Sequence, residues 1–319
     1  MLCLFSQHFP TCVASLLERS KTLQRSFREE TVTDILMASL VALGGGSVIV
    51  EFPDEPTTGA DMEWNFVNPD DKTSFQILLQ AKKVHDKSTD WRRHSYRELF
   101  YRSGPSKILQ VETLCKAATS RTTANSFATY PIYILYNSTT TLNLTRAGGA
   151  TNVLGVNLCD GYLIYMFANF ARPKSARSTL RTLDCLHPFL FPLTRLFCPS
   201  NILPIRPMSF AGSMPAILSF HKGHTTAGQP IPPRPDQIRE RIVREQNRVL
   251  ELFPNEDVDF SLPEVPPVHN TIPDSIQRVL DNSQSPGSFE RERLPFWRVT
   301  FVSATPRDDL GQPIDRRAD

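Results

Sequence analysis

The sequence predicts an α/β protein built around a central mixed β-sheet. An acid-rich start at residues 28–34 opens a segment with helical spacing, and the runs "ADMEWNFV" and "SFQILLQAKKV" that follow are typical of neighbouring strands. Further on, a basic segment with helical spacing precedes the mainly apolar run "YPIYILYNS". Strands joined through a crossover helix indicate a sheet covered by helices.

The first core helix is expected in "REETVTDILMASLVALGGG". Its apolar residues Val32, Ile35, Leu36, Leu40 and Leu43 recur at helical spacing, and the glycine run that follows them suits a C-cap. Three strands come next: "SVIVEFP", which a proline ends, then the two runs named above, joined by the turn residues "NPDDKT". The order so far is helix, strand, strand, strand.

A crossover helix is expected after Pro105, where Ile108, Leu109, Val111 and Leu114 can form one face. "YPIYILYNS" and "GYLIYMFANF" are both predicted as buried strands, and the pair Cys159 and Asp160 before the second run as a turn. The segment 171–222 is expected to pack on this unit as irregular helices, since prolines interrupt its apolar clusters.

Composition divides the chain into three ranges. Residues 1–25 are predicted to be an N-terminal extension, 26–222 the folded domain, and 223–319 a proline-rich, partly disordered tail. Within the tail we expect a linker from Thr225, one charged helix in "QIRERIVREQNRVLELF", a lone strand candidate "FWRVTFVSA", and disorder in the final residues.

Charge is distributed unevenly along the chain, although the formal net charge is only +2. Residues 51–71 carry seven acidic side chains and no basic one, whereas residues 72–122 carry eleven basic side chains and four acidic ones. An acidic cluster beside a basic stretch suits a site that holds a cation and a polyanion together. Two solvated faces of opposite sign would give the same pattern.

The six cysteines are scattered and have no metal-binding spacing, so free or buried thiols in a reducing compartment are expected. No uninterrupted apolar run reaches the length of a transmembrane helix, and the first residues lack the early basic charge of a signal peptide. We therefore expect a cytoplasmic protein, or a nuclear one if its source is eukaryotic.

Two polar pairs interrupt the second and third strands. Asp61 and Glu63 are two residues apart and share one strand face, and Gln80 and Lys82 obey the same rule on the next strand. If these strands form a hairpin, the four side chains converge at one end of the sheet. Asp61 and Gln80 offer the oxygen ligands that Mg²⁺ or Mn²⁺ prefers, and Lys82 a fixed positive charge.

This arrangement resembles the PD-(D/E)XK, or restriction-endonuclease-like, nuclease superfamily, whose core runs α-β-β-β-α-β. The matching residues are Glu30 in "EETVTD", Asp61 in "TGADMEWNF", and Gln80 with Lys82 in "QAK", a QxK variant similar to the Mrr-like branch. More narrowly, residues 27–84 resemble an uncharacterised, mainly bacterial family with a "TGADWEWWF" and "QAKR" motif pair. Ala60 stands where the superfamily name has a proline.

The resemblance implies Mg²⁺- or Mn²⁺-dependent hydrolysis of a phosphodiester, with DNA favoured over RNA as the substrate. Glu30, Asp61 and Gln80 would hold the metal, and Lys82 would position or polarise the attacking water. Glu29 and Asp34 compete with Glu30 for the role of the helix acid. Glu63 is a candidate for orienting one of these ligands by a hydrogen bond, or for binding a second metal ion.

The basic residues after the third strand are candidate phosphate contacts: Lys83, Lys87, Arg92, Arg93 and Arg97. His85 and His94 are interpreted as surface residues. Two other functions fit the same sequence. One is a nuclease-like binding module without catalysis, and the other is an interaction protein that acts through its proline-rich tail.

Overall fold

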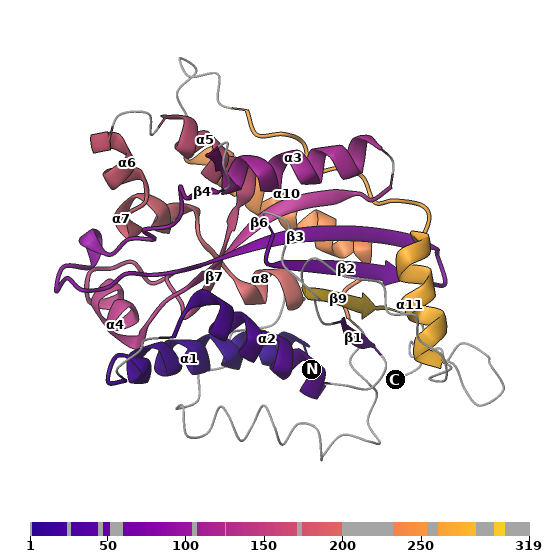
Figure 1. Ribbon diagram of the computed structural model, residues 1–319, viewed down its shortest axis with the longest axis horizontal. Helices are drawn as coiled ribbons and strands as arrows, with labels where there is room; N and C mark the ends of the chain where they lie inside the picture. Colours follow the sequence, from indigo (N-terminus) through magenta and orange to yellow (C-terminus); the bar gives the residue numbers. More distant parts are fainter. Residues whose placement is uncertain are drawn as a thin grey trace.

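The computed structural model describes residues 2–23, 27–43, 47–51, 60–103, 107–124, 126–170, 174–199, 232–253, 261–284 and 297–303. Its central element is a seven-stranded mixed sheet in the order β1-β9-β2-β3-β6-β7-β8 (Figure 1). The strands are β1 Val48–Glu51, β2 Met62–Asn68, β3 Thr73–Lys83, β6 Thr129–Tyr136, β7 Val156–Asp160, β8 Phe191–Pro192 and β9 Trp297–Val302. The protein is thus α/β with a central mixed sheet, as the sequence predicted.

Strands β2 and β3 form the expected antiparallel hairpin, with Met62 opposite Leu79 and Asn68 opposite Thr73. The turn is fixed by Asn68, whose side-chain oxygen accepts a hydrogen bond from the backbone N–H of Asp70 at 3.0 Å. Lys72 closes it with a φ of 54°, the left-handed conformation that a tight turn requires. Strand β3 then pairs in parallel with β6, which the crossover helix α3 (Gln110–Thr123) makes possible.

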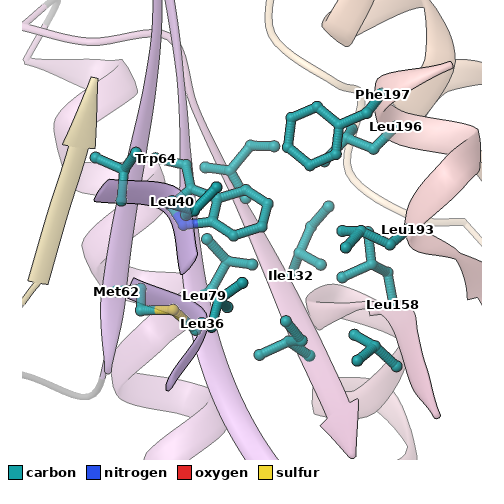
Figure 2. Packing of buried hydrophobic residues seen from close by; sticks show 14 of the residues in the cluster. Leu36, Leu40, Met62, Trp64, Leu79, Ile132, Leu158, Leu193, Leu196 and Phe197 are labelled. Carbon is teal, nitrogen blue, oxygen red and sulfur yellow. The ribbon is translucent and has the colours of Figure 1, made fainter. Parts of the chain in front are cut away.

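Helices cover both faces of the sheet. One face packs against α1 (Leu2–Ser20), α2 (Glu29–Leu43), α8 (Leu193–Phe197) and part of α10 (Pro235–Glu251), in one continuous apolar cluster. Figure 2 shows part of this cluster, where Leu36 and Leu40 of α2 lie near Met62 and Trp64 of β2. The other face packs against α3 and α5 (Gly161–Phe170).

Shorter elements complete the fold. They are α4 Thr139–Ala147, α6 Lys174–Leu180, α7 Leu183–Leu186, α11 Asp274–Gln284, the 3₁₀ turns Trp91–Arg93 and His187–Phe189, and the two-stranded ribbon of β4 Arg102–Ser103 and β5 Ile108–Leu109. The short helices α6, α7 and α8 occupy the range in which irregular helices were expected.

Both ranges that were expected to flank the domain contribute to its core. Helix α1 buries Phe5, Phe9 and Val13 in the main apolar cluster, so residues 2–20 are not a separate extension. Strand β9, the lone strand candidate of the tail, lies between β1 and β2, antiparallel to the first and parallel to the second. The expected boundaries at residues 25 and 222 therefore do not separate folding units. The expected glycine C-cap, the linker from Thr225 and the final residues lie outside the described residues.

The run "GYLIYMFANF" is the helix α5, so its prediction as a strand was wrong, and the strand is the preceding "VNLCD". The buried residues of this helix recur at helical spacing: Leu163, Ile164, Phe167 and Ala168. In a short run that is apolar at nearly every position, this spacing cannot be recognised from the sequence. The expected turn at Cys159 and Asp160 is the end of β7. There the Asp160 carboxylate accepts hydrogen bonds from the first backbone N–H groups of α5.

One cysteine pair contradicts the expectation of free thiols. Cys3 at the start of α1 and Cys198 after α8 form a disulfide across 195 residues of sequence. Both elements pack in the same core, and this contact brings the two sulfurs together, which spacing along the chain could not show. Cys12, Cys115, Cys159 and Cys185 are free. None of the described helices combines the length and apolar character needed to cross a membrane.

Candidate active site

The first pair of predicted site residues meets where β2 begins and β3 ends. Asp61 immediately precedes β2, and its backbone N–H donates to the Leu79 carbonyl at 2.9 Å, which continues the hairpin ladder. Its Oδ2 accepts hydrogen bonds from the Gln80 amide at 2.5 Å and from the backbone N–H of Ala81 at 2.7 Å. The predicted convergence of Asp61 and Gln80 is confirmed.

Burial sets the protonation of Asp61. Removal from water disfavours the carboxylate and raises its pKa from 3.8 to about 6, and the exposed acid Glu30 acts in the same direction. The ammonium of Lys82 and the N–H of Ala81 oppose this rise without cancelling it. Lys82 itself is only 4% exposed. A buried acid and a buried cation therefore act on each other at the end of the hairpin.

Of the acids of α2, Glu29 contacts Lys82, whereas Glu30 is the one whose charge acts on Asp61. The Glu29 Oε1 lies 3.9 Å from the Lys82 Nζ, and burial together with Glu98 and Glu30 raises the pKa of Glu29 while Lys82 lowers it. Glu30, the preferred residue in the sequence, is exposed at the start of the same helix. Asp34 is also exposed, and its carboxylate accepts a hydrogen bond from Trp297. The structure thus favours Glu29 as the partner of Lys82, with Glu30 beside it.

A cleft of about 480 Å³ opens next to these residues. Its lining combines the start of α2, the end of β3 and the segment before β4: Arg28, Glu29, Glu30, Lys83, Val84, His85, Arg97 and Glu98. Arg28 and Glu98 were missed from the sequence. Glu98 lies among basic residues and 68 positions after Glu30, so only the folded chain brings the two together.

Glu63 does not belong to this cleft, although it follows Asp61 on the same strand face. It is 1% exposed, and its two carboxylate oxygens accept hydrogen bonds from Arg298 Nε at 3.1 Å, Arg121 Nη1 at 2.8 Å and Asn65 at 3.0 Å. Both oxygens are occupied by side chains of α3, β2 and β9. The prediction that Glu63 could ligate a metal is therefore corrected: it holds the sheet and α3 together.

The predicted phosphate contacts have separate environments. Lys83 lines the cleft and donates a hydrogen bond to the Phe27 carbonyl, which fixes the chain before α2. Lys87 is exposed. Arg92 lies over the Trp91 ring and 3.7 Å from Asp184, and Arg93 lies 3.9 Å from Asp90. Only Lys83 and Arg97 of the five predicted cations line the cleft.

The interpretation of His94 as a surface residue was wrong, whereas His85 is partly exposed in the cleft lining. His94 is fully buried, with Nδ1 3.1 Å from the Thr141 hydroxyl and Nε2 2.8 Å from the Ser88 carbonyl. His85 is half-buried in the cleft lining. Burial and the charges of Arg97 and Lys87 lower its pKa, which favours the neutral form of its imidazole.

The residues at the hairpin end fit a hard divalent cation. The Oε1 of Gln80 is buried and has no hydrogen-bond partner among the described residues, and Asp61 supplies a carboxylate beside it. Among the parts of the chain that the structure describes, no three His, Cys, Asp or Glu side chains gather closely enough to hold a metal ion by themselves. Two acids and an amide suit Mg²⁺, which keeps several of its waters.

A second groove, of about 840 Å³, lies between α3, α5 and residues 261–263, with a mainly apolar lining. The acid and the cation in its lining, Glu112 and Lys116, pair with each other at 2.7 Å. It therefore lacks the converging polar groups of the smaller cleft.

The fold and the cleft define an α/β protein with a central mixed sheet and an acid–amide–lysine cluster at one hairpin end. A family described as a family of unknown function (DUF6615) matches residues 2–308 of the chain. The chain belongs to this family. Comparison with curated proteins gave no match, and comparison with solved structures gave none either.

Proposed function

We propose that this protein is a Mg²⁺- or Mn²⁺-dependent nuclease of the PD-(D/E)XK type, with DNA favoured over RNA as its substrate. The observation that carries the proposal is the pairing of Asp61 with Gln80 across the hairpin, with Lys82 and Glu29 beside them. An unpartnered amide oxygen next to a buried carboxylate supports a cation at this point. A neutral sheet face would need neither the buried acid nor the buried lysine.

Each residue has a separate task in this proposal. Asp61 and Gln80 would hold the metal with Glu29 or Glu30, and when bound the metal would supply Lewis-acid polarisation of the phosphodiester. Lys82, held by burial and by Glu29, would orient the attacking water through its N–H groups or stabilise the charge that develops on the phosphoryl oxygens. Its position within a buried hairpin end restricts the motion of its ammonium group.

The order of elements supports the same class of fold. Apart from the short ribbon of β4 and β5 between β3 and α3, helix α2, strands β1, β2 and β3, helix α3 and strand β6 follow the order α-β-β-β-α-β of the restriction-endonuclease-like core. Strand β9 enters between β1 and β2, so this protein would carry one added strand inside that core. We propose the core assignment on this basis.

The test is cleavage of plasmid, linear and single-stranded DNA and of RNA, with Mg²⁺, Mn²⁺ or EDTA. We expect metal-dependent cleavage of DNA that Asp61→Ala and Lys82→Ala each reduce by about 10²- to 10⁴-fold, with melting temperatures that show folded variants. Arg146→Ala, an exposed arginine of α4, is the matched control. If the wild type cleaves DNA and both variants cleave it equally well, the assignment of this site would be overturned.

A binding module without catalysis is the second candidate. The lack of a three-acid cluster among the described residues favours it, because a weaker ligand set can bind nucleic acid without turning it over. It predicts salt-dependent binding of DNA with no cleavage in any metal. A tail that functions independently is less compatible with the fold, since removing β9 would take a strand out of the sheet.

A further inference from the structure

The cleft carries two cations that form no ion pair with the described residues. Arg28, just before α2, and Arg97, in the segment before β4, are both exposed, and neither forms an ion pair with any described residue. By contrast, Arg92 and Arg93 each lie within 4 Å of an aspartate. Exposed arginines that face a shared cleft from different segments are suited to the planar, bidentate recognition of a phosphate.

A third group in the same lining also lacks a partner. The Nε2 of His85 is buried and has no hydrogen bond among the described residues. Its imidazole lies in the cleft with Arg28 and Arg97, and the charge of Arg97 acts on it directly. A polar atom left unsatisfied in an otherwise charged cleft indicates that a ligand supplies the missing hydrogen bond.

The acids of the cleft explain why the arginines remain available. Glu29 is directed to Lys82, and the lining also carries the acids Glu30 and Glu98. A polyanion can approach such a site only if cations in the lining or a bound metal offset this negative charge. Arg28 and Arg97 supply part of that offset.

We propose that Arg28, Arg97 and His85 form a phosphate-binding subsite that holds a backbone phosphate of the DNA strand next to the one that is cleaved. The proposal rests on the proposed nuclease function and assigns the substrate contacts of that cleft. The arginines position the strand by charge, and the histidine supplies one neutral hydrogen bond. None of the three is assigned a part in the bond-breaking step.

The experiment measures binding of a fluorescently labelled single-stranded oligonucleotide by anisotropy, with Ca²⁺ in place of Mg²⁺ so that turnover does not interfere. We expect Arg28→Ala and Arg97→Ala each to weaken binding about 3- to 10-fold, and to lower the slope of log affinity against log salt by about 0.7 to 1. His85→Ala should weaken binding without changing this slope, because a neutral imidazole displaces no counterion.

Arg146→Ala is the control, an exposed arginine of α4 outside the cleft, which should leave both affinity and slope unchanged. Unchanged affinity and slope in Arg28→Ala and Arg97→Ala, with normal melting temperatures, would overturn the subsite even if the wild type cleaves DNA. The wild type could instead bind DNA and never cleave it, while Arg28→Ala and Arg97→Ala lose binding. That result would support the subsite and refute the nuclease.

Discussion

Asp61 and Glu63 lie two residues apart on one face of the same strand region, yet their surroundings are opposite. Asp61 contacts an amide and a backbone N–H beside an open cleft, and burial raises its pKa to about 6. Glu63 is held by two arginines and an asparagine with no oxygen left over. Shared alternation fixes the direction of a side chain, whereas the partners that reach it decide whether it can act on a ligand.

The largest difference concerns stability. Glu63→Gln removes a buried charge and leaves Arg298 and Arg121 facing a neutral amide, so we expect the free energy of unfolding to fall by about 3–5 kcal/mol. Chemical denaturation monitored by tryptophan fluorescence, to which the buried Trp64 contributes, measures the loss. A change below about 1 kcal/mol would show that the arginines find other partners.

Removing the charge of Asp61 should have the opposite effect on the free energy of unfolding. Because its pKa is raised by folding, the protonated form favours the folded state, and this contribution is lost as pH rises from 3.8 through about 6. At pH 8, Asp61→Asn should therefore increase the free energy of unfolding by about 1–3 kcal/mol. At pH 4, where wild-type Asp61 is largely protonated in the folded state, the difference should nearly vanish.

Asp184→Asn is the matched control for that experiment. Its carboxylate is half exposed and lies 3.7 Å from Arg92, so its loss should change stability by less than about 1 kcal/mol at either pH. Destabilisation by Asp61→Asn at pH 8 would mean that Gln80, Ala81 and Lys82 together stabilise the carboxylate more than its burial disfavours it.

Local signals predicted the part of the site that is built by a hairpin. Turn residues and strand alternation placed Asp61 opposite Gln80, because both signals act within about twenty residues of sequence. The fate of Glu63 depended on Arg298, which is 235 residues away, and on β9 entering the sheet between β1 and β2. The sequence of β2 contains no pattern that indicates which strand will pair with it from the far end of the chain.

Two other predictions from the sequence were wrong for the same physical reason. Helix α5 is apolar on nearly every position because both the sheet and α3 cover it, and a fully apolar run of ten residues carries little information about period. The disulfide between Cys3 and Cys198 follows from the packing of α1 against α8, a contact between the two ends of the core. In both cases tertiary packing, and not local pattern, set the outcome.

The last prediction concerns the pH dependence of DNA cleavage, which should depend on Asp61 and not on Glu63. A carboxylate must lose its proton before it can ligate a metal, so DNA cleavage should fall about tenfold for each pH unit below about 6, the pKa of Asp61. Because protons and Mg²⁺ compete for the same oxygen, raising the Mg²⁺ concentration tenfold should move the midpoint towards lower pH, by at most about one unit. Glu63→Gln, assayed at a temperature where it remains folded, should keep this midpoint, since Glu63 contacts arginines and not the cleft. The titrating group would lie outside the proposed metal site if the pH midpoint of cleavage did not change with Mg²⁺ concentration, or if Glu63→Gln shifted it.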